Sequence, residues 1–174
     1  MASIFLDRDG VINKRIVDDY VTRPEDFILL DGVLEAIAIF ARKFDHVFIV
    51  TNQQGIGKGL MTEDDLAAIH GGLINAVEKT GGHIDRIYHC PALKSAHSFM
   101  RKPSIGMALK ARHDYPDVVL RDSVMVGDSE SDMLFGRRAG MTTVLVGDEP
   151  MIARRSPHLV DYYYATLHDY ALTL

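Results

Sequence analysis

The stretch of sequence that decides the fold is SIFLDRDGVIN, residues 3–13. It begins with a short apolar run, Ser3–Leu6, which is typical of a strand covered on both faces in a parallel sheet. Two carboxylates follow at Asp7 and Asp9, and Gly10 allows the chain to turn away sharply. Residues i and i+2 of an extended segment point to the same side, so both carboxylates can address one ligand. The stretch therefore predicts a buried first strand with reactive groups at its end.

Similar apolar runs recur along the chain and alternate with amphipathic helical stretches, the pattern of βαβ units. Further strands are predicted at Val47–Val50, Ile84–His89, Val124–Val126, Thr143–Val146 and Tyr162–Tyr164. Helices are predicted at Gly32–Phe44, from Thr62 to about Gly81, and at Ile105–Tyr115, Ser129–Ala139 and Thr166–Leu172. Right-handed crossovers then predict an α/β fold with a doubly wound, Rossmann-like parallel sheet. Since no repeat or linker interrupts the pattern, we expect residues 1–174 to form a single domain.

The helix after the second strand carries a local start signal. Thr62 is followed three residues later by Asp65, which resembles a capping box. Leu66 and Leu73 then fall on one face of the helix, and the pair Gly81-Gly82 predicts its end.

Composition excludes several classes of protein. The 174 residues are 47% hydrophobic and 25% charged, as in one compact soluble domain with a full core. The net charge of −5 offers no basic surface for nucleic acid, and no apolar run approaches the roughly 20 residues of a membrane span. The early charge at Asp7 leaves no place for a signal peptide, and the single cysteine, Cys90, fits a reducing compartment. We expect a cytoplasmic protein without nucleic-acid or membrane partners; its oligomeric state stays open, and a monomer is compatible with the sequence.

Polar side chains follow four of the predicted strands. Asp7 and Asp9 follow the first, and the triplet Thr51-Asn52-Gln53 follows the second. Arg101-Lys102 lies in the loop after the third, and Gly127-Asp128 follows the fourth, with Asp132 shortly after it. Because ligands bind at the carboxyl ends of strands in such sheets, we expect these groups to meet in one crevice.

Their chemistry predicts magnesium-dependent phosphoryl transfer. Clustered carboxylates repel one another unless a cation joins them, and Mg²⁺ prefers oxygen ligands. Asp7 would attack phosphorus as a nucleophile, and Asp9 would act as acid and base. Thr51 and Lys102 would hold the phosphoryl oxygens, and Asp128 would complete the metal site. Asp132, one helical turn on, would orient Lys102 or Asp128.

Each of these residues has an ordinary structural interpretation when taken alone. An isolated D-x-D-G is common in turns, Thr51 could cap a strand end, and Lys102 could be a solvated surface charge. Gly127-Asp128 could be a turn that leads into a helix. The placement of all four groups after successive strands favours the catalytic interpretation.

These motifs resemble those of the haloacid dehalogenase (HAD) superfamily over nearly the whole chain. The matching residues are Asp7-Arg8-Asp9-Gly10-Val11, Thr51-Asn52, Lys102, and Gly127-Asp128 with Asp132. The resemblance implies that Asp7 is the nucleophile and Asp9 the acid/base. It also implies that Mg²⁺ is held by the Asp7 carboxylate, the backbone carbonyl of Asp9 and the Asp128 carboxylate.

A narrower resemblance is to the heptose-bisphosphate phosphatases and the histidinol-phosphate phosphatases, which lack large cap domains. It is carried by DRDGVIN at residues 7–13, TNQQGIGKG at residues 51–59 and RKP at residues 101–103. It implies a minimal cap and a small phosphorylated metabolite as substrate, most plausibly a heptose 1,7-bisphosphate that loses its 7-phosphate. Arg101 and the segment that contains Asn52, Gln53 and Lys58 would bind the rest of this substrate.

The chain departs from that group in one loop, Cys90–Met100. Many members carry three cysteines and a histidine there, which bind zinc, whereas this chain has one cysteine with His89 and His97 nearby. Structural zinc sites use four ligands and usually several thiolates, so we expect no zinc. What orders the loop in its place is left open by the sequence.

Three alternative functions remain. A histidinol-phosphate phosphatase would use the same chemistry on a different substrate. A phosphatase of nucleic-acid 3′ ends shares a T-N-Q-x-G-I segment, but the acidic net charge argues against it. A non-catalytic phosphoacceptor receiver has a similar acidic magnesium site, but its acceptor aspartate follows a middle strand and it lacks the partner that Asp9 provides.

Overall fold

The computed structural model describes residues 2–148 and 150–174 and contains one six-stranded sheet, in which all paired strands are parallel. The strand order is β3-β2-β1-β4-β5-β6. The bounds are β1 (Ser3–Leu6), β2 (His46–Asn52), β3 (Arg86–Cys90), β4 (Val124–Gly127), β5 (Thr142–Val146) and β6 (Tyr162–Tyr164). All six predicted strands are confirmed. The largest differences are at β2, which extends two residues beyond its predicted end, and at β3, which begins two residues later.

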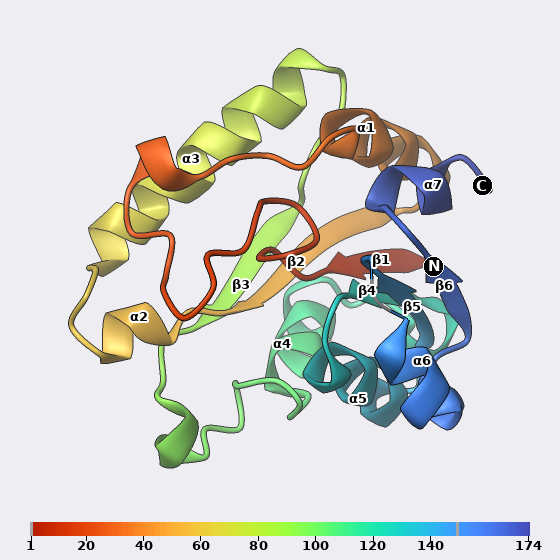
Figure 1. The fold of residues 1–174 in the computed structure, drawn as a ribbon. Coiled ribbons are helices and arrows are strands. Elements are labelled where there is room, and N and C mark those ends of the chain that lie inside the picture. The colour runs from red at the N-terminus through yellow and green to blue at the C-terminus, as the bar shows by residue number, and fades with distance from the viewer. Residues whose placement is uncertain (1, 149) are drawn as a thin grey trace.

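Helices cover both faces of the sheet (Figure 1). They are α1 (Val33–Lys43), α2 (Gln54–Gly57), α3 (Glu63–Lys79), α4 (Gly106–Asp114), α5 (Glu130–Ala139), α6 (Met151–Arg155) and α7 (Leu167–Ala171). The five predicted helices are confirmed. Their predicted ranges include the capping residues at both ends, except that Gly140, the C-terminal cap of α5, lies one residue beyond the predicted end. The capping box of Thr62 and Asp65 is present. The short helices α2 and α6 were not predicted.

Alternation of side chains along β1 divides the core into two layers. Ile4 and Leu6 belong to the cluster that packs against α1, α3 and α7. Phe5, which points the other way, packs with Met107 and Phe135 from α4 and α5. The doubly wound α/β architecture is thus confirmed, and its central strand is buried on both faces.

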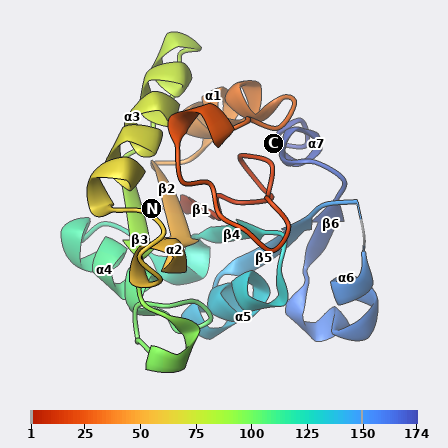
Figure 2. The same ribbon diagram turned by 60° about the vertical axis from the view of Figure 1, so that its left-hand side comes forward.

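The segments that follow the strands form the surface at the carboxyl edge of the sheet. The segment between β1 and α1, drawn in orange-red, loops out beyond the strand ends (Figure 2). Only the short helix α2 lies between β2 and α3 among the described residues, in keeping with the minimal cap that we predicted. In the described parts of the chain, 2–148 and 150–174, no helix combines the length and the apolar character needed to cross a bilayer.

Candidate active site

A buried lysine joins two of the predicted carboxylates. The Nζ atom of Lys102 lies 2.7 Å from Asp7 Oδ1 and 2.6 Å from Asp132 Oδ1, and all three side chains are buried. Asn52 places this lysine, because its Oδ1 accepts from the Lys102 backbone N (3.0 Å) and its Nδ2 donates to the Lys102 carbonyl (3.2 Å). Of the two partners that we considered for Asp132, the structure pairs it with Lys102.

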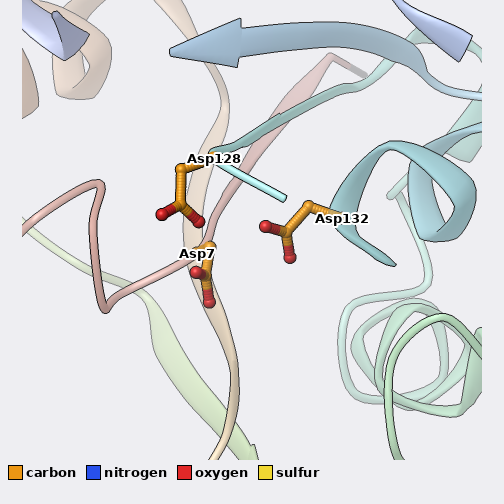
Figure 3. Close-up of side chains that lie close together, drawn as sticks. All are labelled: Asp7, Asp128 and Asp132. Atoms are coloured by element: carbon orange, nitrogen blue, oxygen red, sulfur yellow. The ribbon is translucent and has the colours of Figure 1, made fainter. Parts of the chain in front are cut away.

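Asp7 from the end of β1, Asp128 from the end of β4 and Asp132 from the first turn of α5 converge (Figure 3). One oxygen of each lies within 4.8 Å of the others, a spacing at which a metal ion can be shared. Gly10, at φ +89°, makes this approach possible, since a Cβ there would lie 2.0 Å from Asp128 Oδ2. Gly127 has the same role beside Asp132, because a Cβ at that position would lie 2.2 Å from the Asp132 Cβ.

The charges of this cluster are unbalanced. Burial, together with the neighbouring Asp132, raises the pKa of Asp7 to about 7 and that of Asp128 to about 6. Burial opposes the charge of Lys102, but the carboxylates Asp132 and Asp7 raise its pKa to about 12. Among the described residues, three carboxylates thus face the buried Lys102, which bonds to Asp7 and Asp132, and the half-exposed Arg15, which contacts Asp128. The set is all oxygen and negatively charged, which suits a hard divalent cation.

Asp9 is held away from this cluster by three donors. Its Oδ1 accepts from Arg8 Nη2 (2.8 Å) and Asn13 Nδ2 (3.0 Å), and its Oδ2 accepts from Gln53 Nε2 (2.9 Å). Burial acts to raise the pKa of Asp9, but Arg8, with the bonds from Asn13 and Gln53, lowers it below the ordinary value. The carboxylate is therefore fixed in direction and favoured in its ionised form.

Arg8 and His70 form a buried support that sequence reasoning missed. Arg8 is 1% exposed, its Nη1 lies 3.2 Å from His70 Nε2, and its guanidinium lies 5.5 Å from the centre of the Phe27 ring. Burial and Arg8 lower the pKa of His70 to about 3, so His70 is neutral and accepts from the arginine. The available signal was an arginine placed between two carboxylates at a strand end, where its charge must be compensated.

Thr51 and Gln53 are linked below the surface of the site. Thr51 Oγ1 accepts from Gln53 Nε2 (2.9 Å), and both side chains are buried. Gln53 therefore bridges Thr51 and Asp9, whereas we predicted that it would bind substrate. Gln53 is not among the residues that line the two cavities, and its direct contact with substrate stays a prediction.

Two adjoining cavities open beside these groups. The first, of about 510 Å³, is lined by Asp7, Asp9, Arg15, Ile16, Asp18, Asp19, Tyr20, Asn52, Gln54, Lys58, Arg101, Lys102, Ser129, Ser131 and Asp132. Three of the four predicted substrate-binding residues, Asn52, Lys58 and Arg101, therefore lie on its wall. The second, of about 590 Å³, is lined by Asn52, Lys94, His97, Ser98, Arg101, Lys102, Pro103, Ser104 and Ser131. The two cavities share Asn52, Arg101, Lys102 and Ser131.

The segment Cys90–Met100 is ordered by hydrogen bonds and close packing. Arg101 Nη1 donates to the Ala92 carbonyl (3.2 Å), and the Lys94 backbone N donates to Gln54 Oε1 (3.3 Å). Helix α2 lies directly against the segment, since a Cβ on Gly57 would be 2.5 Å from the Pro91 carbonyl oxygen. Of the residues considered for zinc, Cys90 is buried, and His89 Nε2 lies 2.7 Å from Glu63 Oε2. The expectation that zinc is not needed stays a prediction.

Comparison with known proteins places these features in a family. The HAD-hydrolase-like family matches residues 99–169. D-glycero-α-D-manno-heptose-1,7-bisphosphate 7-phosphatase from Campylobacter jejuni is 39% identical over 84% of this chain and 83% of the relative. D-glycero-β-D-manno-heptose-1,7-bisphosphate 7-phosphatase from Vibrio cholerae is 36% identical over 96% of this chain and 92% of the relative. The crystal structure of a Bordetella bronchiseptica D,D-heptose 1,7-bisphosphate phosphatase, complexed with magnesium and phosphate, superimposes with a TM-score of 0.87 at 33% identity and covers 99% of this chain and 97% of that one.

Proposed function

This chain belongs to the HAD-like hydrolases, in the group of the heptose-bisphosphate phosphatases, and from this premise we propose that it removes the 7-phosphate of a heptose 1,7-bisphosphate. Membership makes it a phosphoric monoester hydrolase. The observation that carries the choice of substrate is the pair of adjoining cavities with shared polar lining residues, because a bisphosphate needs two anion sites close to each other. The relatives include enzymes named for either anomer, so the anomer stays open.

Asp7 is the nucleophile of the proposed reaction. Its carboxylate attacks phosphorus, the bond from phosphorus to the sugar oxygen breaks, and a phosphoaspartate forms. Lys102 neutralises charge beside it, since Nζ is 2.7 Å from Asp7 Oδ1. Asp132 and Asn52 hold the lysine in place through its side chain and its backbone.

Asp9 moves the protons. In its protonated form it gives a proton to the leaving sugar oxygen, and it then takes one from the water that attacks the phosphoaspartate. This second step releases inorganic phosphate and restores Asp7. The contacts from Arg8, Asn13 and Gln53 fix the direction of the carboxyl group. They favour its ionised form, which is the form that accepts the proton from water.

The residues present fit Mg²⁺. The carboxylate oxygens of Asp7 and Asp128 lie close together, and the Asp9 carbonyl lies on the same side, where Arg15 contacts it together with Asp128. Asp7, Asp128 and the Asp9 carbonyl would hold the ion, which neutralises the charge of the phosphoryl oxygens when it is bound. We expect chelation to stop turnover reversibly.

The second cavity supports a second phosphate. Among the described residues that line it, Lys94, Arg101 and Lys102 are basic, three are serines, and none is acidic. Arg101 stands at the junction of both cavities, and its planar fork is suited to a phosphate. In the first cavity, Asp18 and Asp19 provide acceptors for the hydroxyls of a sugar between the two phosphates.

The test is Arg101→Ala on two substrates. We expect KM for heptose 1,7-bisphosphate to rise about 10- to 100-fold, the loss of one charge-assisted contact of 1.5–3 kcal/mol. KM for an aryl phosphate, which has no second phosphate, should change much less. Arg121→Ala, which removes an exposed arginine in the turn before β4, is the matched control. Equal effects of Arg101→Ala on both substrates would reject the assignment of the second phosphate.

Histidinol phosphate is the alternative substrate that a particular observation favours. Asp18 and Asp19 are exposed on the wall of the first cavity and could pair with its cationic amine. The substitutions Asp18→Asn and Asp19→Asn discriminate: they should lower kcat/KM strongly for histidinol phosphate if it is the substrate. A higher kcat/KM for histidinol phosphate than for either heptose bisphosphate anomer would establish this alternative.

We also propose a reducing cytoplasm as the place of action, which the buried free thiol of Cys90 would suit.

A further inference from the structure

Arg15 makes a contact that neither the mechanism nor the sequence motifs use. Its Nη2 atom lies 3.1 Å from Asp128 Oδ1 and 3.3 Å from the carbonyl oxygen of Asp9. These two acceptors come from the ends of different strands, β4 and β1. One nitrogen of one side chain therefore joins two oxygens that are 119 residues apart in sequence (128 minus 9).

The same two oxygens belong to the set that would hold the divalent cation, so this inference rests on the proposed function. Magnesium binds its oxygen ligands at about 2.0–2.1 Å in near-octahedral geometry. A guanidinium nitrogen on the same two oxygens would lie well inside the repulsive range of a doubly charged ion. The oxygens can serve one cation at a time.

We propose that Arg15 is a built-in competitor of the divalent cation: it compensates Asp128 and the Asp9 carbonyl until the ion displaces it. Displacement releases the guanidinium into the first cavity, on whose wall Arg15 already lies. Ion binding is thereby coupled to the delivery of one further positive charge to the place where the phosphoryl group binds.

The position of Arg15 makes the exchange easy. Its side chain is 51% exposed, whereas that of Asp128 is 15% exposed, so the arginine can leave into solvent without opening the core. Solvent screens the exposed arginine, which weakens its ion pair with Asp128. By contrast Lys102, which is 2% exposed and bonded to Asp7 and Asp132, cannot leave without exposing a buried network.

The experiment compares Arg15→Gln with Lys58→Gln in the full chain, without substrate. Lys58 lines the same cavity, and in the described structure its charge lies over the Tyr20 ring rather than on Asp9 or Asp128. It therefore controls for the loss of one positive charge. Two quantities are measured for each protein: the Mg²⁺ Kd by calorimetry, and the Tm in EDTA and in saturating MgCl₂.

We expect Arg15→Gln to tighten the Mg²⁺ Kd by about 2- to 5-fold beyond the effect of Lys58→Gln. Its Tm should fall in EDTA and equal that of the wild type in saturating MgCl₂, because Arg15 acts only when the ion is absent. A Tm that falls equally in both conditions would show a purely structural role and overturn the proposal.

The outcomes also separate this proposal from the proposed function. A Kd for Arg15→Gln no tighter than that for Lys58→Gln would overturn the competition alone, whatever the substrate. Loss of heptose bisphosphate as substrate, with the Arg15→Gln signature retained, would overturn the substrate alone. No Mg²⁺ binding to the wild type would overturn both the metal site and the competition.

Discussion

At the carboxyl ends of β1 and β4, Asp7 and Asp132 share the buried Lys102 beside a third carboxylate, Asp128. At the amino ends of β2 and β3, by contrast, two carboxylates contact one histidine, His46. His46 Nδ1 lies 3.1 Å from Asp85 Oδ1, and its Nε2 lies 2.9 Å from Asp117 Oδ2. Burial opposes the charge of His46, but the bonds from Asp117 and Asp85 raise its pKa. Asp85 Oδ2 also accepts from the Val47 backbone N at 2.7 Å, which ties the start of β2 to β3.

The pKa of Asp117 at the amino end and those of Asp7 and Asp128 at the carboxyl end move in opposite senses. At the amino end, the bond from His46 lowers the pKa of Asp117, so each charge there is favoured by its partner. At the carboxyl end, burial and Asp132 raise the pKa values of Asp7 and Asp128. The difference teaches that this domain keeps costly negative charge at the end of the sheet where we propose that a cation and a phosphate bind. It gains stability from matched charges at the opposite edge.

Of the substitutions considered, Asp7→Asn should have the largest effect, because it removes one of the three clustered carboxylates at the carboxyl end of the sheet. We expect kcat to fall by roughly 10⁴-fold or more, the scale on which removing a covalent nucleophile acts in other hydrolases. The metal-free protein should become more stable, because a buried carboxylate of raised pKa is removed. In the wild type, the loss of folding stability caused by ionising the buried Asp7 is absent below the ordinary pKa of 3.8. It grows as pH rises and is complete above about 7.

The measurements are steady-state turnover and thermal unfolding in EDTA at pH 5 and pH 8. Stabilisation by Asp7→Asn should be larger at pH 8. Turnover of the Asp7→Asn variant near the wild-type rate would reject a phosphoaspartate intermediate. A variant less stable than the wild type at pH 8 would contradict the view that the negative charge of Asp7 destabilises the metal-free protein.

Gly10→Ala tests the close approach of Gly10 to Asp128 at the carboxyl end of the sheet, and we expect an effect of intermediate size. The new Cβ would lie 2.0 Å from Asp128 Oδ2 at a φ of +89°, so Asp128 must shift. We expect weaker Mg²⁺ binding and a loss of about 2–4 kcal/mol in the free energy of unfolding.

Gly140→Ala is the matched control, because Gly140 has a similar φ of +78° and no atom within 4 Å of its Cβ position. That variant should lose only about 1 kcal/mol and leave Mg²⁺ binding unchanged. Similar losses of stability in both variants would mean that backbone strain alone, rather than contact with Asp128, explains the effect of Gly10→Ala.

His46→Gln should have the smallest effect, and it tests whether the charge of His46 stabilises the amino end of the sheet. Since the pKa of His46 is raised by folding, its charged form stabilises the protein below the ordinary value of 6.5. That stability is lost as pH rises through the higher folded pKa. We therefore expect His46→Gln to lower Tm by a few degrees at pH 6 and to differ little from the wild type near pH 9, measured by thermal unfolding.

His158→Gln, which replaces an exposed histidine in the turn Pro157–Leu159, should leave Tm unchanged at both pH values. A deficit of His46→Gln that is equal at pH 6 and pH 9 would assign the role of His46 to packing against Phe48 and Tyr115 instead of to its charge.

The sequence by itself determined the strands, the long helices and the set of residues at the strand ends. Hydrophobic periodicity and capping pairs such as Thr62 with Asp65 are local, so they can be read without knowing the neighbours in space. Parallel strands then bring their carboxyl ends to one edge, which is why Asp7, Lys102 and Asp132 were expected together and lie together. The short helices α2 and α6 escaped, because they have only four or five residues and neither begins with a side-chain cap. Helix α7 is equally short but begins with the capping box of Thr166 and Asp169.

Only the tertiary structure decided how the polar side chains divide their contacts. Gln53 reaches Asp9, Arg8 finds His70, and Arg15 reaches Asp128, each through pairs far apart in the chain. The number and direction of donors around a carboxylate depend on packing in three dimensions, and long side chains have several rotamers that sequence cannot rank. The types of group at the site follow from sequence, whereas their pairing and their pKa values follow from burial and distance.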